Sequence, residues 1–172
     1  MTKPILKEAL TTGFYSIVRQ VEPIDESTFF APIGDKWSIA ENILHLTQSA
    51  KSLNQGLALP KEVLAEQFGK IDRAHFNYEA VVSNYLAILS TGLKARGAFV
   101  PELPDNPSKT VLISSFIKHH EALADFLDTF TETELDELCI RHPVLKLLTL
   151  REMYYFMHYH FGHHLIAIQK GI

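Results

Sequence analysis

Histidines gather near the end of the chain, where four of the nine fall within seven residues: His158, His160, His163 and His164. Only His160 and His164 stand four positions apart. On a helix this spacing places two imidazoles on one side, with their Cβ atoms about 5–6 Å apart. Two such rings can reach a single metal ion at about 2.0–2.1 Å each, as the paired histidines of helical zinc sites do. The pair therefore indicates part of a metal site, and a third ligand must come from elsewhere in the chain.

The segment around this pair predicts one strong helix. Thr149 suits the N-cap position, and Glu152 three residues later completes a capping box. Gly171 is placed to end the helix about twenty residues further on. At about 100° per residue, one apolar face carries Leu150, Met153, Tyr154, Met157, Phe161, Leu165 and Ile168.

The four histidines take different positions around this helix. His164 lies just inside the edge of the apolar face, and His160 lies just outside it. The helix angle carries His158 to the other flank and His163 well away from the core. Histidines at a helix end can also be solvated polar side chains without a ligand, so the helix alone leaves both interpretations open.

A third candidate ligand, His45, lies on another predicted helix. Ser38 and Glu41 form a second capping box, so a helix begins there and runs to about residue 54. His45 stands off the apolar face of this helix, on a flank that it shares with Ser38, Asn42 and Ser49. Such a flank of small polar groups suits the wall of a groove. The alternative is an exposed histidine on a surface helix.

The remaining pattern predicts an all-α four-helix bundle with short extra helices and more than about 60% helix. No alternating β-branched run is present, so the prediction needs no strands. His119 falls on the apolar stripe of its helix and His120 lies off it, so His119 is expected to point inward. The expected long helices cover residues 3–22, 38–54, 72–95, 108–130 and 149–170, with short ones within 55–72 and from 131.

The composition limits which classes of protein are possible. The chain has 172 residues, 47% of them hydrophobic, which suits one globular domain over residues 1–172. The net charge is −4 and no basic cluster is present, so nucleic acid is not an expected partner. No apolar run is long enough for a membrane span, and no signal peptide precedes the first helix. Cys139 is the only cysteine, which fits a reducing cytoplasm.

Two stretches resemble the signatures of the DinB-like superfamily, which includes YfiT-type metal-dependent hydrolases. Residues 37–46 are similar to W-s-x-x-E-x-x-x-H-L, with Trp37, Glu41 and His45 at the matching positions. Residues 142–153 are similar to H-P-x-x-G-x-L-T-x-R-E-M, and a helix with H-x-x-x-H follows. The two signatures stand at the separation found in the family. One departure is Lys146, in the local run where many relatives have glycine.

The resemblance implies a four-helix bundle with up-down-down-up connectivity, usually assembled as a homodimer. It also implies a divalent metal, most often nickel or zinc, on His45, His160 and His164. Three neutral imidazoles leave coordination positions open, as in catalytic metal sites. Asn42, His119 and Tyr159 are candidates for contacts with these ligands or with a substrate. The general acid or base and the catalytic residues are not identified.

Two reactions on a small-molecule substrate fit such a site. In the first, the metal activates water for a hydrolysis. In the second, it holds a low-molecular-weight thiol as the thiolate and delivers it to an electrophile, as the thiol transferases of the family do. The alternative is a non-catalytic bundle that binds a metal or a ligand in a stress response.

Three structural expectations follow. The nitrogens of the three proposed ligands should lie about 3–4 Å apart, because ligands about 2 Å from one ion crowd together. His158 and His163 should point elsewhere. Phe14, Tyr15 and Tyr155, which stand off the main apolar stripes, could cover the helices of a partner in a homodimer.

Overall fold

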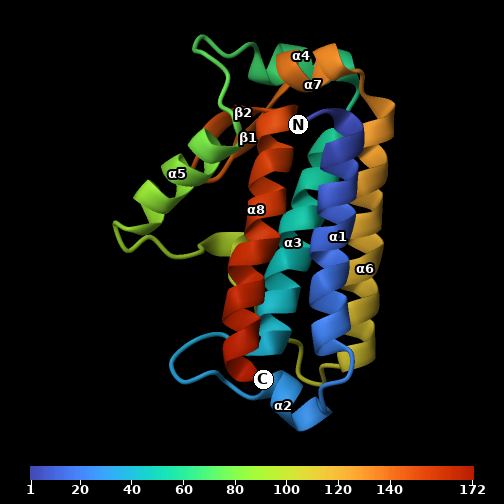
Figure 1. Cartoon of the computed structure of the whole chain (residues 1–172), viewed down its shortest axis with the longest axis vertical. Coiled ribbons are helices and arrows are strands. Elements are labelled where there is room, and N and C mark those ends of the chain that lie inside the picture. Colours follow the sequence, from blue (N-terminus) through green and yellow to red (C-terminus); the bar gives the residue numbers. More distant parts are fainter.

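The computed structural model describes residues 1–172, and four long helices form its body (Figure 1). α1 and α8 run in one direction, and α3 and α6 run in the other, which is the expected up-down-down-up connectivity. Each of the four packs against two others, in the order α1, α6, α3, α8 around the bundle. As a result α3 and α8 are antiparallel neighbours. The bounds are Lys3–Val21 for α1, Ile39–Leu57 for α3, Lys109–Phe126 for α6 and Leu150–Ile168 for α8.

Shorter elements occupy the connections, mostly between α3 and α6 and just before α8. The structure is 67% helical, which confirms the predicted fold class. α5 leans away from the bundle on the side of α8 (Figure 1). These elements are α2 (Glu26–Phe30), α4 (Lys61–Phe68), α5 (Tyr78–Leu89), the 3-10 turn η1 (Gly97–Phe99), η2 (Leu127–Thr129), α7 (Glu132–Glu137), the strands β1 (Cys139–His142) and β2 (Lys146–Thr149), and η3 (Gln169–Gly171).

The predicted helix over residues 72–95 was too long, and the buried carboxylate of Glu152 accounts for its late start. Glu152 is 1% exposed and accepts hydrogen bonds from the Arg73 guanidinium at 2.8 and 2.7 Å. It also accepts one from the backbone N–H of Phe76 at 2.7 Å. These bonds hold the chain before α5 against the first turn of α8. The helix therefore begins only after Asn77, whose side chain caps it.

The prediction that no strands are needed was wrong at one place, the antiparallel hairpin of β1 and β2. Each strand has only four residues, too few to show a period of two. Part of the turn is stabilised by a side chain, because His142 Nδ1 accepts hydrogen bonds from the backbone N–H groups of Val144 and Leu145 at 3.1 and 2.9 Å. Pro143 is the only common turn residue in the turn, and the imidazole of His142 supplies the rest of its hydrogen bonding.

Lys146 closes this turn with a φ of 64°, the left-handed conformation that glycine adopts most easily. It stands where the family pattern has glycine. A side chain in this conformation costs about 1–2 kcal/mol, so the loop keeps the glycine-like backbone with a strained lysine in it.

A single hydrophobic cluster of 33 buried residues joins the helices. The aromatic residues assigned to a dimer surface belong largely to this cluster: Phe14 is 1% exposed and Tyr155 is 5% exposed. Tyr15 packs against the cluster, and its hydroxyl donates a hydrogen bond to Glu121 at 2.6 Å. The expectation that Phe14 and Tyr155 face a partner was wrong, whereas Tyr15 is only half-buried and its role stays a prediction. None of the helices is both long and apolar enough to cross a membrane.

Candidate metal centre

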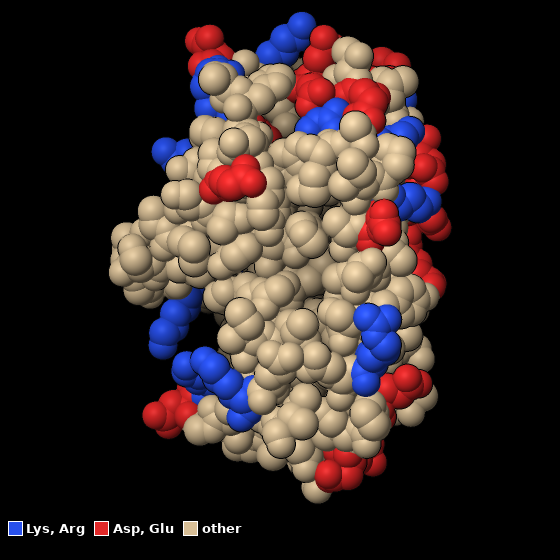
Figure 2. Space-filling view, viewed as in Figure 1, with Lys and Arg blue, Asp and Glu red and all other residues tan.

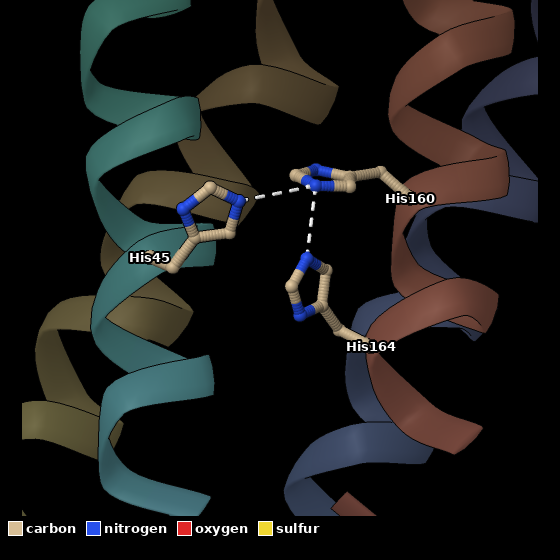
Figure 3. A group of neighbouring side chains, drawn as sticks. All are labelled: His45, His160 and His164. Carbon is tan, nitrogen blue, oxygen red and sulfur yellow. Dashed lines mark hydrogen bonds between the residues drawn. The ribbon is translucent and has the colours of Figure 1, made fainter. Parts of the chain in front are cut away.

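His45 meets His160 and His164 inside the bundle, across the contact between α3 and α8 (Figure 3). Nε2 of His160 lies 3.2 Å from Nε2 of His45 and 3.0 Å from Nε2 of His164. One ligand atom from each of the three lies within 4.8 Å of the others. Two nitrogens bound tetrahedrally to one zinc ion are about 3.3 Å apart. Two of the three nitrogen pairs therefore have the spacing expected of ligands on one ion, and the third pair is no more than 4.8 Å apart.

The local helix signals that position these side chains are those read from the sequence. The side chains of Ser38 and Thr149 cap α3 and α8, and each is part of a complete capping box. His160 and His164 lie on successive turns of α8, which stacks their rings with centroids 4.6 Å apart. The antiparallel packing of α3 on α8 brings His45 opposite this pair.

The outer nitrogens of two of the rings have partners that fix the tautomer. His45 Nδ1 lies 2.7 Å from the carbonyl oxygen of Phe99. A carbonyl only accepts, so Nδ1 carries the hydrogen and Nε2 presents its lone pair to the centre. His164 Nδ1 lies 2.7 Å from Oδ1 of Asn42 and is held in the same way.

Asn42 is itself held in one orientation. Its Nδ2 donates hydrogen bonds to the backbone carbonyls of Ser38 at 2.8 Å and Trp37 at 3.3 Å. Those bonds leave Oδ1 facing His164. Such partners of metal-binding histidines set the ring orientation and raise the basicity of the ligand nitrogen.

His160 is positioned by packing instead. Its ring stacks on Phe156 with centroids 4.9 Å apart, and its Nδ1 is buried without a hydrogen-bond partner. Its Nε2 faces two nitrogens that both present lone pairs, and one hydrogen on Nε2 cannot point at both of them. A cation at the centre satisfies all three nitrogens at once, so the donor set fits a metal ion.

Burial keeps the three imidazoles in the form that binds metal. His45 is 7% exposed, His160 2% and His164 6%. Desolvation lowers the pKa of His45 and lowers the pKa of His160 and His164 well below the usual 6.5. The rings are therefore neutral at pH 7, and no proton has to leave before a metal binds. Imidazole ligands suit zinc and nickel among the divalent metals.

The triad lies in a cleft of about 1070 Å³ between α3, α8, α5, the segment around η1 and the hairpin. Its walls are largely apolar, and they include Trp37, Tyr85, Phe99, Phe156 and Met157. The Trp37 ring lies parallel to that of His164, with centroids 6.2 Å apart. An apolar cleft with a few converging polar groups is the usual form of a small-molecule site.

The prediction that His119 points inward was wrong, and its neighbour His120 is the buried residue. His119 is only partly buried, and it does not line the cleft. His120 is the buried neighbour, 1% exposed, with Nδ1 bonded to the Phe116 carbonyl at 2.7 Å. Tyr159 is half-buried against Tyr85, with ring centroids 6.0 Å apart, and it does not line the cleft either.

The other histidines of α8 divide between two places. His158 packs beside Tyr78, with ring centroids 5.5 Å apart, and stays out of the cleft as expected. His163 does not supply a ligand atom to the triad, but it lines the same cleft, contrary to the expectation that it points away. His142 also lines the cleft, which its place in a turn motif did not reveal.

One of three comparisons with known proteins found a match. A search of curated proteins and a search of solved structures each returned no match. A family model, described as the DinB superfamily, matches residues 16–168. The match includes all three histidines and runs from α1 to the end of α8. The four-helix bundle, the buried histidine triad and this match agree: the chain belongs to the DinB superfamily.

Proposed function

We propose that this protein is an enzyme that uses a divalent metal, nickel or zinc, held by His45, His160 and His164, to act on a small molecule. The observation that carries the proposal is the convergence of three Nε2 atoms in a cleft, with the Nδ1 atoms of His45 and His164 fixed by outer partners. When bound, such a metal lowers the pKa of a coordinated water or thiol and so supplies a nucleophile near neutral pH.

The residues of the cleft then have separate tasks. Asn42 and the Phe99 carbonyl keep the ligand rings in the correct tautomer. Tyr85 lines the cleft, and burial raises its pKa to about 12, so its hydroxyl stays protonated at neutral pH. It can donate a hydrogen bond to a bound molecule but cannot act as a base.

Of the two reactions that fit the site, the cleft favours transfer of a thiol over hydrolysis. Metal-dependent hydrolysis commonly uses a carboxylate near the metal as general base. Asp35 is the only acidic residue that lines this cleft, and its side chain is exposed. A thiol needs no such base, because it gives up its proton more easily than water does and sulfur is the stronger nucleophile.

The rival function is a bundle that binds a metal or ligand without catalysis. A cleft whose only acidic residue is the exposed Asp35 fits this alternative as well. A metal-binding bundle would differ from the enzyme only in lacking turnover, whereas a ligand-binding bundle would not need the triad.

The first experiment titrates metal-free protein with Ni²⁺ and with Zn²⁺ by calorimetry, and measures bound metal by mass spectrometry. We expect one ion per chain. The His45→Ala variant should lose tight binding, whereas the His163→Ala variant should keep it, because His163 lines the cleft without joining the triad. Equal binding by the wild type and His45→Ala would refute the metal centre.

The second experiment assays the metal-loaded protein for conjugation of simple thiols to 1-chloro-2,4-dinitrobenzene and for hydrolysis of a panel of nitrophenyl esters. Thiol conjugation that disappears in His45→Ala supports the transferase. Ester hydrolysis alone supports the hydrolase. One bound metal with neither activity favours the non-catalytic alternative.

We also propose a homodimer, and the support for it is the family resemblance alone. Sedimentation equilibrium at micromolar concentration should give twice the chain mass of 19.5 kDa. A mass of one chain would remove the dimer from the proposal and leave the metal centre unaffected.

A further inference from the structure

Positive charge borders the cleft that contains the triad. Six of the 16 lysines and arginines line it, but only one of the 20 acidic residues, Asp35. This is a strong local reversal in a chain whose net charge is −4. In Figure 2, lysine and arginine atoms lie on either side of the notch beneath α5. The six, here called the basic rim, are Lys36, Lys94, Arg96, Arg141, Lys146 and Lys170.

The basic rim is also unpaired. The ion pairs of the structure involve other cations: Lys7, Lys61, Arg73 and Arg151. All six side chains of the basic rim are exposed, and none has an acidic partner within 4.0 Å. The rim is drawn from the loop before α3, the segment after α5, the hairpin and the C-terminal turn, so it surrounds the cleft instead of following one helix. Charges placed in this way attract anions to the opening.

One member of the basic rim is kept in a strained conformation. Lys146 has a φ of 64°, and the turn would accept glycine with less strain. Strained backbone of this kind is more frequent at functional sites than elsewhere, so it supports a role for this residue. Glycine would allow the same backbone path with less strain, but only lysine adds a positive charge beside the cleft.

We propose that the cleft binds an organic anion: a molecule with an apolar body and a carboxylate or phosphate group that meets the basic rim. The apolar walls would contact the body, and the triad would face the end that reaches into the cleft. This inference rests on the proposed function, because it names the substrate class of the same cleft. Its test does not require a bound metal.

The test compares two probes that differ only in charge, 4-phenylbutyrate and its amide, 4-phenylbutanamide. Trp37 lines the cleft and is the only tryptophan, so its fluorescence reports binding of either probe. We expect the carboxylate to bind about tenfold more tightly than the amide at low salt. The preference should shrink as salt approaches 1 M, where the Debye length falls to about 3 Å.

Two variants and one control locate the effect. The double variant Arg141→Gln, Lys146→Gln should lose most of the preference for the carboxylate. Lys146→Gly should weaken the preference while it keeps or raises the urea midpoint of unfolding, because it removes strain. The control Lys51→Gln, Lys118→Gln changes the net charge equally at exposed positions outside the cleft and should keep the preference.

The results separate this inference from the proposed function, because metal binding is titrated on the same samples. Equal affinities for carboxylate and amide would overturn the inference, even if the metal binds. No saturable fluorescence change with the carboxylate would also overturn it, as would a loss in the control equal to that in the rim variant. If the protein prefers the carboxylate but binds no metal, the anion-binding inference stands and the proposed metal-dependent function is refuted.

Discussion

Two buried polar clusters lie along α8, and they are built in opposite ways. At the first turn, each oxygen of Glu152 accepts two hydrogen bonds: Oε1 from Arg73 and Phe76, and Oε2 from Arg73 and Thr149. Further along the same helix, the lone pairs of His45 and His164 face His160 without enough hydrogens between them. The first cluster is complete within the chain, whereas the second leaves its facing nitrogens incompletely hydrogen-bonded and could hold a cation.

This difference distinguishes a cluster with a structural role from one with a candidate functional role. A complete buried cluster stabilises the fold, since removing one partner leaves the others unpaired in a low dielectric. A cluster of converging acceptors adds no comparable stability to the metal-free fold, and here it forms the candidate metal centre. The same helix thus carries a structural site and a candidate functional site, about two turns apart.

The largest expected effect belongs to the triad. Replacing His160 by leucine, which is apolar and of similar size, should lower metal affinity at least about 1000-fold, or about 4 kcal/mol. The unfolding free energy of the metal-free protein should stay the same or rise, because the replacement removes one of three facing nitrogens. Calorimetric metal titration and urea unfolding measure the two quantities. A variant that keeps its metal affinity but loses stability would show that the triad is structural.

Glu152→Ala should give the opposite result. Loss of the carboxylate leaves Arg73 and the backbone N–H groups of Phe76 and Thr149 without their partner, at a cost of roughly 3 kcal/mol in the free energy of unfolding. Urea unfolding measures this loss, and the folded variant should still bind one metal ion. Asp128→Ala, in an exposed pair with Lys7, should cost far less than Glu152→Ala and is the matched control. Equal losses in both variants would contradict the distinction.

A smaller effect is expected at Asn42, which contacts a ligand without being one. Asn42→Ala removes the partner of His164 Nδ1 and should weaken metal binding about 10–100-fold. Asn42→Asp keeps an acceptor for His164 but loses the Nδ2 donor to the Ser38 and Trp37 carbonyls, so its affinity should fall between those of Asn42→Ala and the wild type. Both affinities come from competition with a chelator of known strength. Full affinity in Asn42→Ala would mean that packing alone orients His164.

The last prediction concerns how stability depends on pH. Burial lowers the pKa of His160 in the folded state. As the pH falls, His160 is therefore protonated in the unfolded chain before it is protonated in the folded one. The stability of the metal-free protein then decreases below about pH 6.5. Burial alone would raise the pKa of Glu152, but hydrogen bonds from Arg73, Phe76 and Thr149 lower it, so its contribution is lost only below its usual 4.5.

His160→Leu should therefore flatten the stability profile between these two values, by up to about 1.4 kcal/mol per pH unit. Urea midpoints at half-unit steps of pH, without metal, test this. Parallel profiles for the variant and the wild type would show that His160 is protonated equally in the folded and unfolded states.

Much of the site could be predicted from local sequence. The pair His160 and His164 follows from helix spacing, and the capping boxes at Ser38 and Thr149 fix where α3 and α8 begin. His45 was open to two interpretations from its own helix, and the family signature selected it. The prediction for His119 was wrong because His119 and His120 lie near opposite edges of the apolar stripe. A small error in helical phase is then enough to exchange which of the two is buried.

The sequence by itself determined what depends on neighbours along the chain: the long helices, their caps and the ligand pair on α8. Tertiary structure decided everything that joins distant segments. It brought His45 to α8, placed the Phe99 carbonyl on His45, turned His163 into the cleft and collected the basic rim from four separate regions. The physical reason is that helix periodicity fixes directions within one element. Which face meets which depends on packing the whole core, and no local pattern encodes that.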